Sequence, residues 1–85
     1  MRYLVELTSA AARALRRLPP TDRRRIAGCI DALALAPRPA GAKLLAGRER
    51  FYRVRVGDYR VIYQATDELL RILVIRIGHR REVYR

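Results

Sequence analysis

The sequence predicts an α+β domain in which a helical hairpin packs on one face of an antiparallel-rich sheet. Residues 51–64, FYRVRVGDYRVIYQ, alternate apolar and arginine side chains with the period of two that is typical of strands. Two helical stripes precede them, separated by Pro19 and Pro20. An apolar run, LLRILVIRI, follows at residues 69–77. We therefore expect an N-terminal strand, a helical hairpin and a three-stranded meander, as one domain over residues 1–85.

The first half of the chain supplies the strand and both helices. Residues 2–7 alternate loosely, and Thr8 and Ser9 offer an N-cap for the first helix. The two apolar stripes consist of Ala11, Ala14, Leu15 and Leu18, and of Ile26, Cys29, Ile30 and Leu33. Both stripes are expected to face the sheet.

A two-residue hairpin turn is predicted at Gly57 and Asp58, because glycine adopts positive φ without penalty. Such a turn places Arg55 opposite Arg60 and puts both on one face with Arg53, while valines and tyrosines share the other face. Like charges opposite each other are destabilising, so this arginine face indicates a polyanionic ligand. The alternative is that these arginines form the solvated face of a half-buried sheet.

The segments on either side of the hairpin are predicted to be a loop and a buried strand. A loop is expected between the second helix and the hairpin, with Leu44 and Leu45 tucked under the sheet. The continuous apolar character of residues 69–77 favours a central strand buried on both faces.

The net charge of the chain limits the classes of partner that we expect it to bind. A formal net charge of +11, from 19 Lys and Arg against eight Asp and Glu, points to nucleic acid, an anionic membrane surface or an acidic protein. Arg13, Arg16 and Arg17 point away from the first helical stripe and are candidate phosphate contacts. Neither a signal peptide nor a run of membrane-spanning length is evident, so we expect a cytoplasmic protein without a membrane partner.

The residue types present favour phosphodiester chemistry without a metal or cofactor, because the sequence has no metal-ligand cluster and no Gly-rich phosphate loop. Cleavage of RNA by its own 2′-OH needs a base, charge stabilisation at phosphorus and an acid. Arginine supplies the second but cannot be the base. His79 and Tyr84 are the candidates for proton transfer, although a lone histidine after a strand is often a surface residue and Tyr84 could be a packing anchor.

The motifs YRVRVGDYRVIYQ and LRILVIRIGHRREVYR resemble the RelE/ParE superfamily of bacterial toxin–antitoxin toxins, over essentially the whole chain. The resemblance implies a microbial-ribonuclease-like fold and a cognate antitoxin that wraps and neutralises the toxin. For RelE-type members it implies cleavage of mRNA in the ribosomal A site, in contact with ribosomal RNA, without a metal.

The resemblance also implies residue roles. The matching positions are Arg53 and Arg55 for the basic pair, Arg60 for the transition-state arginine, Arg80 for the phosphate and leaving group, Tyr84 for the base, and His79 for a place that is basic or histidine in several relatives. Arg81 is added as a phosphate contact. The basic pair is lysine in the best-known RelE members.

Two other functions stay open. ParE-type members keep the fold and inhibit DNA gyrase without cleaving nucleic acid, and a nonenzymatic RNA- or DNA-binding module would also use a basic surface. We favour the endoribonuclease, because four clustered arginines with a nearby tyrosine exceed what a binder requires.

Overall fold

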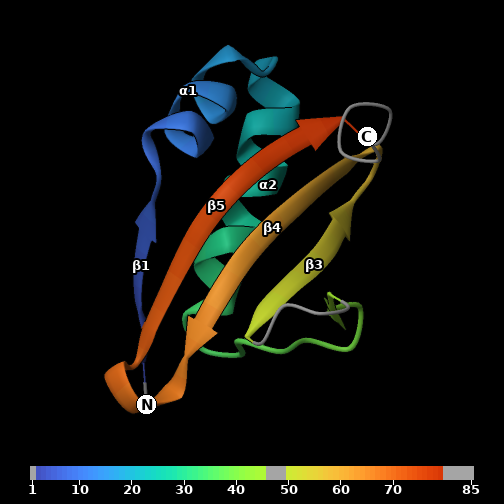
Figure 1. Cartoon of the computed structure of the whole chain (residues 1–85). Helices are drawn as coiled ribbons and strands as arrows, with labels where there is room; N and C mark the ends of the chain where they lie inside the picture. Colours follow the sequence, from blue (N-terminus) through green and yellow to red (C-terminus); the bar gives the residue numbers. More distant parts are fainter. Residues whose placement is uncertain (1, 46–49, 80–85) are drawn as a thin grey trace.

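The computed structural model describes residues 2–45 and 50–79, which form a five-stranded sheet with two helices on one face (Figure 1). The α+β architecture predicted from the sequence is confirmed. Its elements are β1 (Leu4–Leu7), α1 (Ser9–Arg17), α2 (Pro20–Leu33), β2 (Lys43–Leu44), β3 (Phe51–Val56), β4 (Tyr59–Thr66), the short 3-10 helix η1 (Asp67–Leu69) and β5 (Arg71–His79). The strand order is β1-β5-β4-β3-β2; β1 runs parallel to β5, and every other neighbouring pair is antiparallel.

The sheet has two unlike faces, which we call the helix face and the open face. Both helices pack on the helix face and form the core with alternate residues of the strands, while the open face lies toward the viewer in Figure 1. The buried core residues are Ala11, Ile26, Ile30, Leu33, Val54, Val61, Tyr63, Ala65, Ile72, Val74 and Ile77. Both helical stripes predicted from the sequence therefore contact the sheet as expected.

The segment before the hairpin differs from its prediction. Lys43 and Leu44 form the edge strand β2 against β3, and Leu44 is 61 % exposed instead of tucked under the sheet, while Leu45 is half-buried. An edge strand has only one neighbour and the helices do not extend over this one, so its leucine stays in contact with solvent (Figure 1).

The last strand also differs from its prediction. Leu69 belongs to η1 and is 65 % exposed, and Leu70 adopts a left-handed φ of 48° that ends this turn before β5 begins. Within β5, burial alternates: Ile72 and Val74 are buried on the helix face, whereas Leu73 is only partly buried. The strand is not buried on both faces, because helices cover only one face of the sheet.

The pairing of β4 with β5 contains a bulge. Ile62 lies opposite Arg76 but Tyr63 lies opposite Val74, which leaves Ile75 as an extra residue on β5. A bulge leaves local backbone groups without a ladder partner, so another group must satisfy them.

Thr8 meets this requirement while it also caps α1. Its hydroxyl donates a hydrogen bond to the carbonyl oxygen of Ile75 (2.7 Å) and accepts one from the backbone N–H of Ala11 (3.1 Å). Its own backbone N–H donates to the carbonyl oxygen of Val74 (2.9 Å). One side chain therefore fixes the start of α1 to the bulge in β5.

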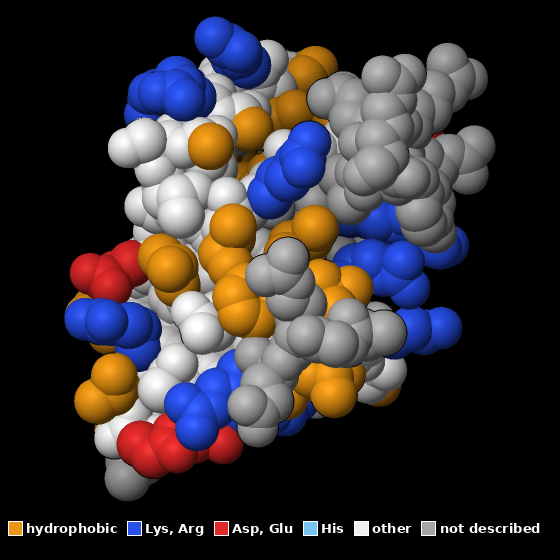
Figure 2. Space-filling view, in the orientation of Figure 1, with side chains coloured by type: hydrophobic (Ala, Val, Ile, Leu, Met, Phe, Trp, Pro, Cys, Tyr) orange, Lys and Arg blue, Asp and Glu red, His pale blue; other side chains and the backbone are white. Residues whose placement is uncertain are grey.

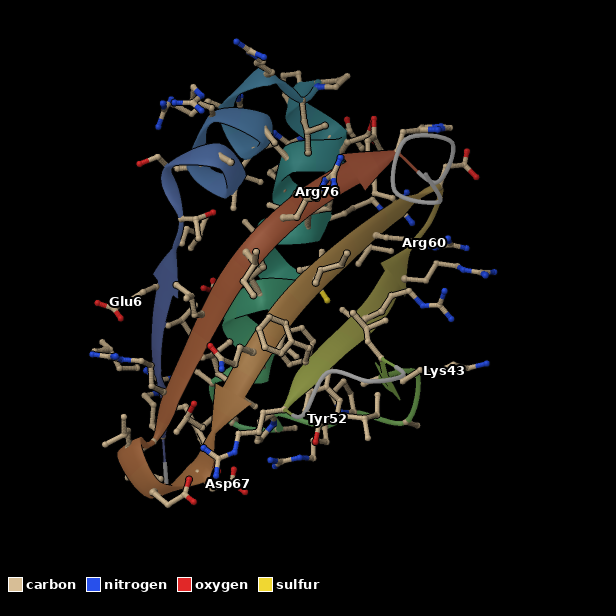
Figure 3. All side chains as sticks on the ribbon, viewed as in Figure 1. Glu6, Lys43, Tyr52, Arg60, Asp67 and Arg76 are labelled. Carbon is tan, nitrogen blue, oxygen red and sulfur yellow. The ribbon has the colours of Figure 1, made fainter. Side chains whose placement is uncertain are left out.

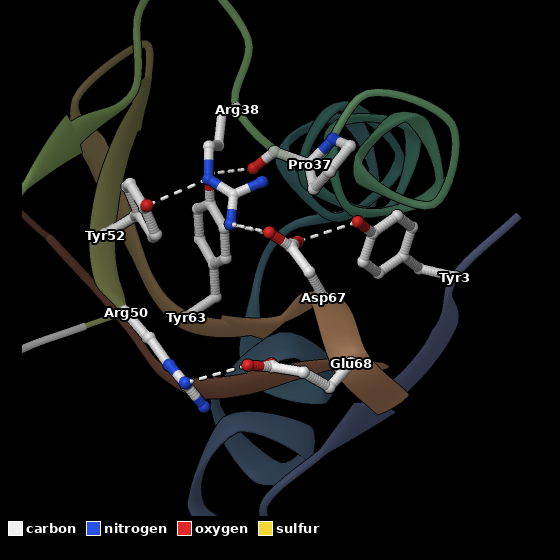
Figure 4. A network of polar contacts seen from close by, with 8 residues as sticks. All are labelled: Tyr3, Pro37, Arg38, Arg50, Tyr52, Tyr63, Asp67 and Glu68. Carbon is white, nitrogen blue, oxygen red and sulfur yellow. Dashed lines mark hydrogen bonds and ion pairs between the residues drawn. The ribbon is translucent and has the colours of Figure 1, made fainter. Parts of the chain in front are cut away.

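A polar network ties the loop after α2 to the far end of the sheet (Figure 4). The Arg38 guanidinium donates to the hydroxyl of Tyr52 (2.8 Å) and to both carboxylate oxygens of Asp67 (3.0 and 2.9 Å). The hydroxyl of Tyr3 donates to Asp67 (2.7 Å), and Tyr52 stacks on Tyr63 with ring centroids 5.6 Å apart. The network joins β1, β3, η1 and the loop.

We expect Thr8→Ala to lower the free energy of unfolding by about 1–2 kcal/mol, because it removes a helix N-cap and the donor to the bulge carbonyl. Thr8→Ser keeps the hydroxyl and is the matched control, with stability close to wild type. Urea unfolding of both variants measures the difference. Equal stability of the alanine and serine variants would contradict this role of the hydroxyl.

Acid should weaken the polar network. The hydrogen bonds from Tyr3 and then Arg38 lower the pKa of Asp67. A carboxyl whose folded pKa lies below its unfolded value of about 3.9 stabilises the fold above that value and loses this contribution as pH falls through the folded pKa. When the pH is lowered, the melting temperature of Asp67→Asn should therefore fall less than that of the wild type. Glu68→Gln, an exposed neighbour, is the control.

Candidate functional site

The β3–β4 turn sets the positions of the site residues. Gly57 has a φ of +60° and Asp58 has no positive φ, which is the pattern of a type II′ turn. The pairing that follows places Arg55 opposite Arg60, and this confirms the predicted register. Because residues opposite each other share a face, both arginines belong to the open face with Arg53.

Two rows of side chains cross the open face at this end of the sheet. The first row is Arg55, Arg60 and Gly78, and the second is Lys43, Arg53, Ile62 and Arg76 (Figure 3). The structure therefore brings together the three predicted hairpin arginines on rigid, adjoining strands. It adds two cationic residues that the sequence interpretation missed, Lys43 and Arg76.

These two residues were missed for identifiable reasons. A strand buried on both faces, as predicted for residues 69–77, has no accessible face for Arg76, and the loop expected before the hairpin includes Lys43. The period of two alone places Arg76 on the face opposite Ile77, and this signal was available in the sequence.

Arg60 differs from its neighbours because it is buried, with only 2 % of its surface exposed, whereas Arg55 is exposed and Arg53 is half-buried. The neighbouring position on β5 is Gly78. A buried guanidinium loses rotameric freedom and much of its hydration. Arg60 is therefore held in place before any ligand binds.

The rest of the open face is largely apolar. Phe51, Ile62 and Leu73 are half-buried on it, although no helix covers them. Figure 2 shows this apolar area in the middle of the sheet, with Lys and Arg side chains at its margin. The face therefore combines an apolar floor with a cationic border.

His79 does not join the arginines. It lies opposite Tyr59 at the end of β5, on the face of Val61 and Ile77, and its ring meets that of Tyr59 edge-on at a centroid distance of 5.6 Å. Arg55 and Arg60 belong to the opposite face. The sheet thus separates the imidazole from the arginine cluster, and continuing the alternation from Ile77 could have predicted this.

The predicted phosphate contacts on α1 form a separate surface. Arg13, Arg16 and Arg17 are all exposed; Arg13 lies in the middle of α1, and Arg16 and Arg17 lie in its last turn, near the junction with α2. Arg23 of α2 lies beside them and donates to the carbonyl oxygen of Arg16 (3.3 Å). Cationic groups near a helix C-terminus are favourable there without any ligand.

The remaining predicted site residues, Arg80, Arg81 and Tyr84, lie outside the described residues. Within residues 2–45 and 50–79, no group of three or more His, Cys, Asp or Glu side chains could hold a metal ion. The same part of the chain contains no helix that is long and apolar enough to cross a membrane.

Comparison with known proteins identifies the class. The model of the ParE toxin of the type II toxin–antitoxin system, parDE, matches residues 5–84. The chain is 32 % identical to Toxin RelG of Mycobacterium tuberculosis, over all of this chain and 99 % of RelG. It is 36 % identical to Toxin RelE of the same organism, over 98 % of this chain and 87 % of that protein.

Solved structures agree with this class. RelE in the archaeal RelE–RelB complex from Pyrococcus horikoshii superimposes with a TM-score of 0.84 and 32 % identity, covering 94 % of this chain and 97 % of that one. The isolated E. coli RelE toxin gives 0.81 and 29 %, covering 96 % and 90 %. The chain therefore belongs to the RelE/ParE superfamily. Within it, the protein is a RelE-like toxin of a type II toxin–antitoxin system.

Proposed function

We propose that this toxin is a ribosome-dependent endoribonuclease that cleaves mRNA in the ribosomal A site without a metal. The observation that carries the proposal is the pair of Arg55 and Arg60, placed opposite each other on rigid strands and flanked by Arg53 and Arg76. Like charges so close together disfavour folding, which is compensated when a phosphate binds between them.

The arginines fit the charge that develops during cleavage. Attack of the 2′-OH on phosphorus places negative charge on the nonbridging oxygens, and donors fixed before the reaction stabilise it best. Arg60 meets this condition, because it is buried and lies in the middle of the row between Arg55 and Gly78. Arg53 and Arg55 are more exposed and suit binding of the substrate phosphate.

Proton transfer needs a different residue. His79 lies on the helix face, away from the arginines, so the geometry favours Tyr84 as the general base over His79. The assignment of Tyr84, like those of Arg80 and Arg81 to the phosphate, rests on the resemblance to RelE-type toxins. A tyrosine base requires neighbouring cations to lower its pKa, and an arginine cluster supplies them.

The same face suits a cognate antitoxin. The relatives from Pyrococcus horikoshii and E. coli were solved as RelE–RelB complexes. Here, half-buried Phe51, Ile62 and Leu73 bordered by cationic residues match an acidic amphipathic segment. Such a segment would shield the arginines, and the net charge of +11 would accelerate its association.

A second candidate is inhibition of DNA gyrase, which is favoured by the match to the ParE family model. It would need the open face as a protein-binding surface and no proton-transfer residue. Induction in cells separates the two functions: the endoribonuclease arrests translation and leaves new mRNA 5′ ends, whereas the gyrase inhibitor triggers a DNA-damage response with filamentation.

Removing the charge of Arg60 should abolish cleavage. Because Arg60 is buried, Arg60→Ala also leaves a cavity, so Arg60→Met is the better variant, since it retains an unbranched side chain without the charge. We expect single-turnover cleavage on a programmed ribosome to slow by about 10²–10³-fold, the scale for removing one preorganised donor. Thermal unfolding of the same variant verifies its fold.

Arg55→Ala is the matched control, because Arg55 shares the row but is exposed. It should weaken ribosome binding more than it slows the cleavage step. A folded Arg60→Met variant that cuts at the wild-type rate would remove Arg60 from the chemistry.

The basic surface of α1 should contribute to RNA affinity. Reversing the charges of Arg13, Arg16 and Arg17 should lower affinity for single-stranded RNA and reduce the slope of log K against log salt by about 2, as three phosphate contacts are lost. The control reverses Arg2, Arg50 and Arg71, which changes the net charge equally. Equal weakening by both sets would show that only net charge matters. Binding that does not change with salt would exclude a polyanionic ligand.

A further inference from the structure

The contact between Tyr59 and His79 marks the place where β4 and β5 meet the helices. The two residues lie directly opposite each other on adjoining strands, and their rings are nearly perpendicular, at 82°. Edge-to-face aromatic pairs are favourable and fix the relative orientation of both rings. His79 is the last residue of β5, so this contact holds the end of that strand.

Tyr59 is in turn held by α2. Its hydroxyl donates a hydrogen bond to the Asp22 carboxylate (3.2 Å) in a part-buried position. Asp22 lies in the first turn of α2, where the helix macrodipole stabilises a carboxylate. The three side chains therefore form a chain of contacts from α2 through β4 to the end of β5.

A second contact from α2 fixes the hairpin turn next to this chain. Arg25, one turn after Asp22, lies across Gly57, where a Cβ atom would come within 3.1 Å of its Nη2 atom. The positive φ of Gly57 already disfavours any other residue there. The start of α2 thus holds both the turn and the first residue of β4.

Tyr59 packs against the hydrophobic core, but the Tyr59–His79 pair is only half-buried. Two hollows of about 210 Å³ flank it. The lining residues other than the pair are Asp22, Arg25, Gly57 and Asp58 on one side, and Ala14, Arg17, Leu18, Ile77 and Gly78 on the other. The hydrogen bond from Tyr59 to Asp22 and the edge contact between the rings help to set their orientation.

We propose that Asp22 and Tyr59 are positioning residues that act through His79 and hold the end of β5 for catalysis. After His79 the chain continues into residues 80–84, which include the arginine and tyrosine assigned to the reaction, so this role rests on the proposed function. A displacement of about 1 Å at reacting groups can cost 10²-fold in rate. An anchor at His79 therefore affects catalysis without touching RNA.

The test is a series at Tyr59 in the full-length toxin. Tyr59→Leu removes the ring, and we expect single-turnover cleavage on programmed ribosomes to slow by about 10²-fold with little change in ribosome affinity. Tyr59→Phe keeps the ring but loses the hydrogen bond to Asp22, so its rate should fall by only about 2- to 10-fold. This partial rescue by the conservative variant is the signature of positioning through the ring.

A second readout needs neither ribosome nor cleavage. His79 is the only histidine of the chain, so its imidazole proton signals are resolved in an NMR spectrum of the free toxin. They should shift strongly in Tyr59→Leu and partly in Tyr59→Phe and Asp22→Asn. Amide hydrogen exchange at Ile77 to His79 should accelerate in the same order.

The matched control is Tyr52→Leu. Tyr52 is also half-buried and also stacks on a ring of the neighbouring strand, but it lies at the opposite end of the sheet. It should lower thermal stability and leave both the His79 signals and the cleavage rate of the folded protein unchanged. If Tyr52→Leu and Tyr59→Leu slow cleavage equally, the effect is general destabilisation and the inference is wrong.

The outcomes separate the two proposals. If wild type cleaves and Tyr59→Leu cleaves as fast, the positioning role alone fails. It also fails if the His79 signals do not move in any variant. If wild type cleaves nothing on ribosomes, the endoribonuclease proposal fails and the catalytic role of the anchor fails with it. If Tyr59→Leu does not fold, the positioning role is tested with Tyr59→Phe and Asp22→Asn instead, through their cleavage rates and the NMR signals of His79. The role fails if neither variant differs from wild type.

Discussion

The two-residue turn at Gly57 and Asp58 is the constraint on which the candidate site depends. In a strand, a shift of one residue moves every side chain to the opposite face. Such a shift in β3 or β4 would place arginines in the core and valines in contact with solvent. The positive φ of Gly57 and the Arg25 guanidinium close to it disfavour a residue with a side chain at this point of the turn. The same register therefore buries the valines in the core and clusters the arginines on the open face.

The contacts that stabilise the fold and the residues of the candidate site lie on opposite faces of the sheet. On the helix face, Thr8, Arg38 and Tyr59 connect elements through hydrogen bonds, and each of them acts on a different part of the sheet. On the open face, the exposed side chain of Arg55 and the half-buried side chain of Arg53 are accessible to a ligand. Substitutions on the two faces can therefore be compared as stability effects and binding effects, except at Arg60, which is both buried and central to the open face.

The features of the fold that follow from short stretches of sequence were predicted correctly. The period of two and the turn chemistry were sufficient for the hairpin register, and the period of 3.6 for both helical stripes. The side of the sheet occupied by His79 and Arg76 was also accessible from the alternation along β5. The burial of Arg60 was not, because the alternation along β4 only assigns Arg60 to the face without helices. Its neighbour on β5, Gly78, lies 18 positions later, and the bulge at Ile75 shifts its alignment with β4. That bulge relies on Thr8, from the other end of the chain. Such non-local pairings have no signal in a single stretch of sequence.

The parallel pairing of β1 with β5 joins the first strand of the protein to the last. Residues 67 positions apart are paired there, so β1 and α1 cannot pack against β5 until β5 has been synthesised. Until β5 emerges, Ile72, Val74 and Ile77 are missing from the core and Arg76 from the open face. Neither the core nor the second row of the open face is therefore complete before β5 is in place.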